Sequence, residues 1–143
     1  MSISPSTRIM NWYSTLTPDS LSDIEQFYAD DARFKDPFNE VHGTRAIKAI
    51  FEHMFATTGA PRFVFIDVIE QGSQSFLTWT FHFQLSGKSY QVAGSSHLRY
   101  DAEGKIVDHR DYWDPAEELW QKLPLIGGFI RFLRRQFLVK QSN

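Results

Sequence analysis

The residues best suited to do chemistry lie within the apolar rows of two predicted strands. His109 and Asp111 share one face of the strand expected over residues 105–113, and Ser96 lies in the apolar face of the strand expected over residues 89–100. A carboxylate is costly to bury in a closed apolar core, so it is paired, protonated or turned toward a cavity. The pattern therefore predicts a pocket against these strands, with His109 and Asp111 as candidate catalytic residues.

The register of the last strand has one alternative. A shift by one residue would turn Asp111 outward and bring Arg110 and Tyr112 inward. A buried arginine costs at least as much as a buried aspartate, so the register that turns Asp111 inward is favoured.

Asp36 is a second candidate catalytic carboxylate. It lies between Phe34 and Phe38 and is followed by Pro37. A carboxyl group in apolar surroundings holds its proton more tightly, which suits a general base at neutral pH. The alternative is an Asp-Pro turn at the surface, and the local spacing by itself favours that turn.

Aromatic side chains are the predicted walls of the pocket. Phe, Tyr and Trp make up 15% of the chain, and such rings are costly to expose and often line ligand cavities. An ordinary aromatic core would give the same composition. The residues expected to contact a small hydrophobic ligand are Trp12, Tyr13, Phe34, Trp79, Phe81, Ser96, Leu98 and Trp113.

No metal and no cofactor are expected. A metal at His109 and Asp111 would need a third ligand, and the sequence holds no His-x-His or His-x-x-x-His pair. The paired glycines at 127 and 128 lack the spacing of a phosphate-binding loop.

The elements that must position these residues follow an α+β order. Apolar residues recur at helical spacing in residues 9–16, 21–28 and 47–54, and alternate with polar residues in residues 62–70, 76–85, 89–100 and 105–113. Three helices followed by a run of antiparallel strands indicate an α+β fold. Its outer sheet face, which carries Thr78, Thr80, His82, Gln84, Ser95, His97 and Arg99, is poor in acidic residues, and we expect a homodimer to form through it.

The C-terminal end differs from the rest of the chain. We expect one domain over residues 1–118 and a helical tail over residues 119–143, with chain breaks at Pro124 and at the paired glycines 127–128. The tail has no acidic residue, and its basic residues are Lys122, Arg131, Arg134, Arg135 and Lys140. Its final amphipathic helix either packs on the domain or a partner subunit, which we favour, or binds an anionic membrane surface.

Bulk properties exclude several classes of function. A formal net charge of -2 gives no basic face for nucleic acid, and the absence of cysteine rules out disulfide and thiolate chemistry. The N-terminus shows no signal peptide and no segment approaches the length of a membrane span, so a cytoplasmic protein is expected.

Two stretches carry a family resemblance. Residues 27–37, Phe-Tyr-Ala-Asp-Asp-Ala-Arg-Phe-Lys-Asp-Pro, with Gly43-Thr44-Arg45-Ala46-Ile47 after them, resemble ketosteroid isomerases. Residues 104–106 leading into 108–114, Asp-His-Arg-Asp-Tyr-Trp-Asp, resemble the last strand of SnoaL-like proteins and limonene epoxide hydrolases. The likeness spans residues 9–113 and implies the nuclear transport factor 2-like superfamily. It implies a cone-shaped curved sheet with three helices on its concave face, a catalytic role for Asp36 by likeness to the isomerases, and one for Asp111 by likeness to the other two groups.

Departures from these families argue against two of their reactions. The isomerase oxyanion tyrosine falls on Trp12, with Tyr13 one position away, and its second oxyanion donor falls on Ser96. The Arg-x-Asp pair of the epoxide hydrolases falls on residues 78–81, Thr-Trp-Thr-Phe. Neither steroid isomerisation nor Asp-Arg-Asp epoxide hydrolysis is therefore expected.

Three functions stay open. The first is proton transfer next to a carbonyl, by an isomerase, cyclase or dehydratase that uses Asp36 or Asp111 as base. The second is a non-catalytic module that binds a hydrophobic molecule, and it needs only the cavity. The third is a protein-interaction scaffold, which would show an exposed apolar patch and a filled cone.

Overall fold

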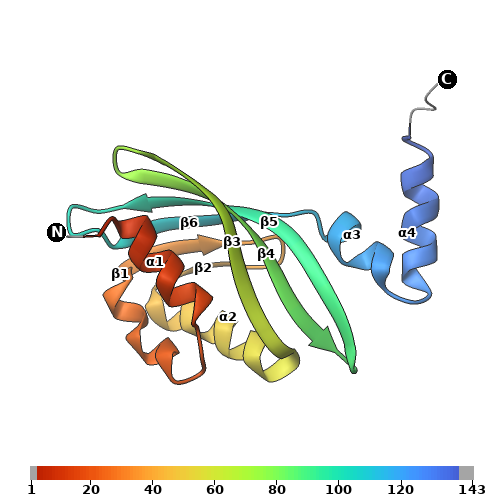
Figure 1. Cartoon of the computed structure of the whole chain (residues 1–143), viewed down its shortest axis with the longest axis horizontal. Coiled ribbons are helices and arrows are strands. Elements are labelled where there is room, and N and C mark those ends of the chain that lie inside the picture. Colours follow the sequence, from red (N-terminus) through yellow and green to blue (C-terminus); the bar gives the residue numbers. More distant parts are fainter. Residues whose placement is uncertain (1–2, 139–143) are drawn as a thin grey trace. The chain divides into compact units, whose positions relative to one another are not determined.

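The computed structural model of the protein describes residues 3–138. The chain divides into two compact units, Met1–Trp113 and Asp114–Asn143. The first unit carries the sheet and the N-terminal helices, and the second is helical (Figure 1). Lys140, one of the predicted basic residues of the tail, lies outside the described residues.

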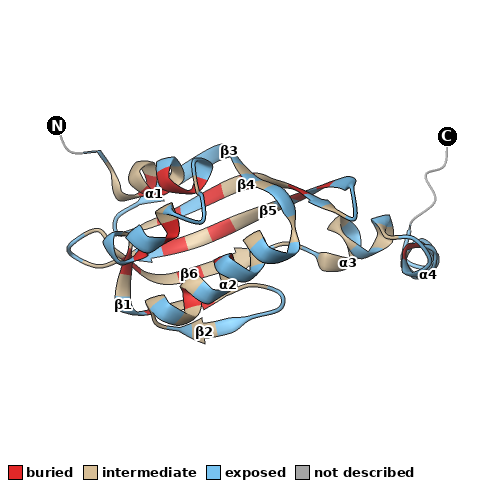
Figure 2. Cartoon of the chain, turned by 90° about the horizontal axis from the view of Figure 1, so that it is seen from below, coloured by how far each residue is buried: buried red, intermediate tan, exposed pale blue. Residues whose placement is uncertain are grey.

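The sheet of the first unit has six strands in the order β2-β1-β6-β5-β4-β3. The strands are β1 (Tyr28–Lys35), β2 (Glu40–His42), β3 (Gly59–Gln71), β4 (Gln74–Leu85), β5 (Lys88–Tyr100) and β6 (Ile106–Tyr112). It curves around the helices, and this arrangement is the predicted α+β cone (Figures 1 and 2).

One pair of strands is parallel, which the predicted antiparallel run did not include. β1 lies beside β6 and runs in the same direction, with Phe34 opposite His109. The remaining neighbours pair antiparallel. Because β6 is inserted between β1 and β5, the N-terminal strand meets the candidate catalytic residues of the last strand.

The N-terminal helical segments are α1 (Pro5–Ser14), the 3₁₀ helix η1 (Ser20–Gln26) and α2 (Thr44–Thr57). Ser4 caps α1 by accepting a hydrogen bond from the Thr7 backbone N–H. The second helix is shorter than the apolar spacing predicts. It ends before Tyr28, which begins β1, because the chain pairs with β6 from Phe27 onward: the Ile106 N–H donates to the Phe27 carbonyl at 2.8 Å.

The inner face of the sheet forms the core. The alternation predicted for β4 and β5 is confirmed, since Leu77, Trp79, Phe83, Val92 and Leu98 are all buried. The register favoured for β6 is also confirmed. His109 is buried and Asp111 lines the interior, whereas the neighbouring Tyr112 is 48% exposed.

The second unit consists of α3 (Pro115–Glu118), the 3₁₀ helix η2 (Trp120–Lys122) and α4 (Ile126–Arg135). The predicted break at residues 127–128 is wrong, because both glycines lie inside α4. A Cβ at Gly127 would lie 2.5 Å from the backbone oxygen of Gln121, so this glycine allows α4 to pack closely on η2. No helix among residues 3–138 is long and apolar enough to cross a membrane.

Candidate functional site

An apolar cavity lies between the inner face of the sheet and the helices of the first unit. About 20 Å³ of it is open to the centre of a water molecule, within about 330 Å³ of unfilled space that extends to solvent. A ligand larger than a few atoms must therefore move side chains as it enters. The lining residues are Ile9, Tyr13, Phe51, Phe63, Phe65, Leu77, Trp79, Ser96, Leu98, His109 and Asp111.

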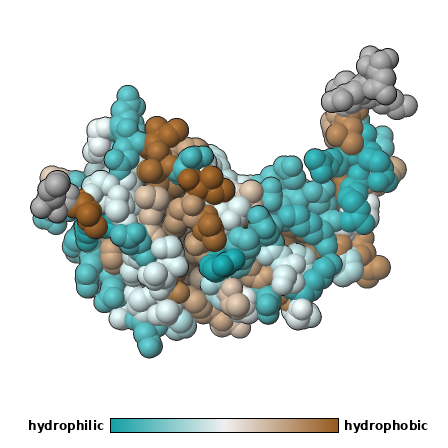
Figure 3. All heavy atoms as spheres, viewed as in Figure 1, coloured by the Kyte–Doolittle hydropathy of each residue, from teal (hydrophilic) through white to brown (hydrophobic). Residues whose placement is uncertain are grey.

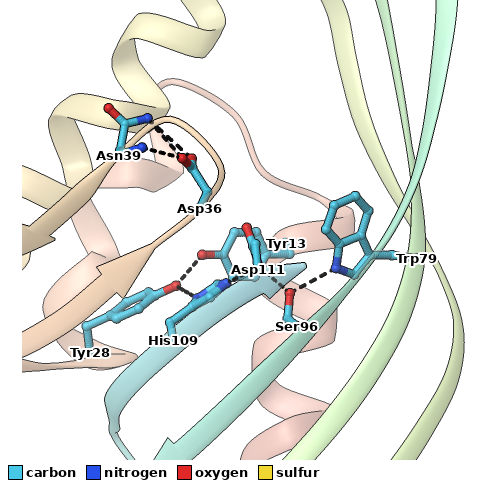
Figure 4. A network of polar contacts seen from close by, with 8 residues as sticks. All are labelled: Tyr13, Tyr28, Asp36, Asn39, Trp79, Ser96, His109 and Asp111. Carbon is cyan, nitrogen blue, oxygen red and sulfur yellow. Dashed lines mark hydrogen bonds and ion pairs between the residues drawn. The ribbon is translucent and has the colours of Figure 1, made fainter. Parts of the chain in front are cut away.

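The polar residues of this cavity belong to one hydrogen-bonded chain (Figure 4). The Trp79 indole Nε1 lies 2.9 Å from Ser96 Oγ, and Ser96 Oγ lies 2.5 Å from Asp111 Oδ1. The same oxygen of Asp111 lies 2.6 Å from His109 Nε2. The other nitrogen of His109, Nδ1, lies 2.7 Å from Tyr28 Oη, and Tyr28 Oη in turn contacts Tyr13 Oη.

The strand register explains how these groups meet. Ser96 and Asp111 are direct partners across β5 and β6. Trp79 of β4 pairs with Gly94, and a Cβ at Gly94 would lie 2.4 Å from the Trp79 ring. The missing side chain therefore lets the indole lie across β5 and reach Ser96, the next inward-facing residue.

The donors in this chain can be assigned from chemistry. An indole N–H only donates, so Ser96 accepts from Trp79 and gives its own hydrogen to Asp111. An ionised Asp111 accepts a second hydrogen bond from His109 Nε2–H. Both bonds end on Oδ1, and the side chain of Asp111 is 17% exposed, so these two bonds leave Oδ2 available as a further acceptor.

Burial controls the pKa values of the two tyrosines in the hydrogen-bonded series. Tyr28 is fully enclosed, and desolvation raises the pKa of its phenol well above the ordinary value of 10.0. Desolvation likewise raises the pKa of Tyr13, an effect that the Tyr28 hydrogen bond reduces and the Asp111 charge increases. Both phenols are therefore neutral donors at physiological pH.

The structure brings together six of the predicted site residues. Tyr13, Trp79, Ser96, Leu98, His109 and Asp111 all line the cavity. They come from α1, β4, β5 and β6, so the predicted inward faces converge on one place.

Asp36 lies apart from them (Figure 4). Its Oδ1 accepts hydrogen bonds from the backbone N–H groups of Phe38 at 2.8 Å and Asn39 at 2.6 Å. The Asn39 side-chain amide donates to both carboxylate oxygens. This is the Asp-Pro turn that the local spacing favoured, and Asp36 is not among the residues that line the cavity.

Four other residues predicted to contact the ligand are not among those that line the cavity. Trp12 donates its indole N–H to the Ser20 carbonyl at 3.1 Å and so ties α1 to η1. Phe34 packs against His109 with ring centroids 4.6 Å apart. Phe81 stacks on Phe63, and Trp113 packs on Phe38.

Sequence reasoning missed Tyr28 as a member of the site. Its apolar spacing assigned it to a helix, and its link to His109 joins residues 81 positions apart. A buried tyrosine needs a partner for its hydroxyl, but only the parallel pairing of β1 and β6 shows which partner it has. Phe51, Phe63 and Phe65 of the wall were also missed.

Metal ligation finds no further support among the described residues. Within residues 3–138, no group of three or more His, Asp or Glu side chains is placed to hold a metal ion.

Solved structures share the fold of this chain. An NTF2-like protein from Burkholderia pseudomallei matches with a TM-score of 0.71 at 21% identity, over 82% of this chain and 95% of that one. A protein of ketosteroid isomerase-like fold from Catenulispora acidiphila, solved in complex with trimethylamine, matches with a TM-score of 0.69 at 15% identity, over 83% and 92%. An LEH-like epoxide hydrolase from M. tuberculosis matches with a TM-score of 0.69 at 15% identity, over 92% and 96%.

The family follows from the sequence itself. The model of the SnoaL-like domain matches residues 9–109, so the chain belongs to the SnoaL-like domain family of the NTF2-like superfamily. No curated protein sequence gives a significant match. The predicted superfamily is confirmed, whereas the reaction is not decided by a fold that carries several activities.

Proposed function

We propose that this protein binds a small, mostly apolar carbonyl compound in its cavity and catalyses proton transfer at the carbon next to the carbonyl. The observation that carries the proposal is the position of Asp111, a carboxylate held by Ser96 and His109 at the edge of an otherwise apolar cavity. A fixed base with one oxygen free is what such a reaction needs.

In this mechanism Asp111 Oδ2 takes the proton from the substrate carbon. The bonds from Ser96 and His109 to Oδ1 fix the carboxylate, so little reorganisation is needed when the proton moves. The electron pair of the broken C–H bond moves onto the carbonyl oxygen and forms an enolate. Asp111 then returns the proton to the same or another carbon of the substrate.

Tyr13, at one end of the hydrogen-bonded series, supplies the donor for the enolate oxygen. When His109 is neutral, Tyr13 donates to Tyr28 and Tyr28 donates to His109 Nδ1. When His109 is protonated, Nδ1–H donates to Tyr28, Tyr28 donates to Tyr13, and the Tyr13 hydrogen turns toward the cavity. The protonated form therefore combines a base at Asp111 with an oxyanion donor at Tyr13.

The size of the cavity limits the substrate. With so little space open to a water molecule, a steroid-sized compound would require large movements of Phe63 and its neighbours. A small ketone needs less, and a relative of this fold was solved with the small ligand trimethylamine.

Exchange of the α-hydrogens of cyclopentanone for deuterium, followed by NMR, tests the proposal. We expect the protein to accelerate exchange over buffer and Asp111→Asn to remove the acceleration. Asp36→Asn is the matched control and should keep it. Equal acceleration by the wild type and Asp111→Asn would disprove the role of Asp111.

A non-catalytic binding or interaction module is the second candidate. The small cavity and the exposed side chains of Val64, Ile66 and Ile69 on β3 favour it. Figure 3 shows apolar side chains gathered over this strand. A protein that binds a neutral ligand equally well as wild type and as Asp111→Asn, with no exchange in either, would be such a module.

We also propose that two copies pair through the outer face of the sheet. Phe76 on β4 and Ile69 on β3 are register partners on that face, and both are exposed in the single chain. Sedimentation should find a dimer at micromolar protein, and Ile69→Lys should shift it toward the monomer.

A further inference from the structure

The second unit contains α4, whose apolar side carries large side chains that are exposed among the described residues. Helix α4 presents Phe129 at 61% exposure, and Phe137 just beyond it is 86% exposed. Leu125, which precedes the helix, is 97% exposed. Large apolar side chains gathered in this way are unusual on a protein surface that faces only water.

These residues form one stripe. At 3.6 residues per turn, Ile126, Phe129, Ile130 and Leu133 fall within an arc of roughly 100° on the helix, and Phe137 follows the same arc if the helix is continued past Arg135. Arg131, Arg134 and Arg135 fall outside this arc, as does Phe132, which is 50% exposed. The helix therefore has a wholly apolar face and a second face that carries the three arginines together with Phe132.

Charge is also distributed unevenly between the two parts of the chain. The second unit, residues 114–143, contains five Lys and Arg and three acidic residues, Asp114, Glu117 and Glu118, for a formal charge of +2. Since the whole chain carries -2, residues 1–113 carry -4. A basic segment attached to an acidic domain points to an anionic partner.

We propose that α4 binds the surface of an anionic phospholipid membrane. Exposed Phe and Leu side chains fit the acyl boundary, and Arg135 fits the headgroup phosphates, whereas a nucleic acid would leave the apolar face uncovered. Arg134 also forms an ion pair with Glu117 at 3.7 Å, so it contributes less to this contact. The helix has ten residues and is about 15 Å long, so it lies in the interface and does not cross the hydrocarbon.

The neighbouring helices hold α4 in shape for this contact. Arg131 donates to the Gln121 backbone oxygen, and Arg134 Nη1 donates to the Gln121 side-chain oxygen at 3.0 Å. Gly127 packs against the same residue. These contacts use the polar side of α4 and do not involve the mostly exposed rings of Phe129 and Phe137, so changing the two rings removes little internal packing.

Vesicle flotation of the full chain tests the proposal. Vesicles of phosphatidylcholine with phosphatidylserine should bind the protein, and phosphatidylcholine alone should bind it much less. Salt should weaken binding, because the headgroup attraction is screened. Arg135→Gln should weaken it about five-fold, since a basic residue near an anionic surface contributes roughly that factor.

The apolar variants separate this proposal from its rivals. Phe129→Ser with Phe137→Ser should reduce vesicle binding by at least about ten-fold per ring. Phe38→Ser is the matched control, because Phe38 is also an exposed phenylalanine but lies in the first unit, and binding should not change. Absence of binding to phosphatidylserine vesicles at low salt would overturn the proposal. So would a double variant that binds vesicles like the wild type, or one whose only change is loss of self-association in sedimentation.

Discussion

Two carboxylates, Asp36 and Asp111, lie close to aromatic residues in the sequence and have different surroundings in the structure. Asp36 accepts hydrogen bonds from the backbone and amide of its own turn. Asp111 accepts hydrogen bonds from two side chains on the inner face of the sheet. A carboxylate whose oxygens are used by its own turn stabilises that turn, whereas one held on a single oxygen keeps the other for a ligand. The partners of a carboxylate therefore distinguish the two roles better than its aromatic neighbours do.

Replacing each aspartate by asparagine tests the difference between Asp36 and Asp111 most directly. We expect Asp111→Asn to lower the rate of cyclopentanone exchange by about 10²–10⁴-fold, the usual effect of removing a general base. Asp36→Asn should change the rate by less than about two-fold, because its contacts lie in the turn. A loss in Asp36→Asn as large as that in Asp111→Asn would contradict the assignment.

Filling the space beside Trp79 tests how Asp111 is held. A Cβ at Gly94 would overlap the Trp79 ring, so Gly94→Ala should lower the free energy of unfolding by about 1–3 kcal/mol. Urea unfolding measures the loss. Trp79→Phe removes the overlapping part of the indole, so the double variant should lose less than the sum of the single variants. Additive losses would show that the two residues do not interact.

The tyrosines sharpen the comparison within the site. Tyr28→Phe leaves both Tyr13 and His109 without their partner and should cost about 1–3 kcal/mol in unfolding free energy. Tyr13→Phe leaves the bond between Tyr28 and His109 intact and should cost about 1 kcal/mol. A larger loss of unfolding free energy in Tyr13→Phe than in Tyr28→Phe would contradict the placing of Tyr28 between Tyr13 and His109.

Alkaline pH tests the burial of both phenols. Burial raises the pKa of Tyr13 and of Tyr28 above 10.0, so each phenol stays neutral in the folded protein at a pH where the unfolded chain ionises. Their contribution to stability is present below about pH 10 and decreases as pH rises above it, by at most about 1.4 kcal/mol per pH unit for each tyrosine. Unfolding of Tyr28→Phe should show a weaker decrease between neutral and strongly alkaline pH. An unchanged slope would contradict the burial of Tyr28.

Sequence alone predicted the parts of the site that depend on strand alternation. Ser96, His109 and Asp111 lie on the inner face, as the alternation of side chains along a strand predicts. The register of β6 could be predicted because a shift by one residue would bury Arg110. Sequence alone did not predict Tyr28 as part of the site, because its partner is fixed by the pairing of the first strand with the last. Asp36 had two interpretations, and only the position of the turn relative to the cavity separates them. The sequence predicts a break at the glycines of α4, because their close packing on η2 is not visible in it.

The place of β6 in the sheet also has a consequence for synthesis of the protein. β6 is the last strand of the sheet to leave the ribosome, yet it lies between β1 and β5. Until residues 106–112 emerge, β1 cannot join β5 through it, and both strands keep an unpaired edge. The nascent chain therefore holds Tyr28 long before His109 exists, and the site assembles in a single late step. A chain that stops before β6 would have open strand edges and no pocket, which makes it a natural target for chaperones and proteases.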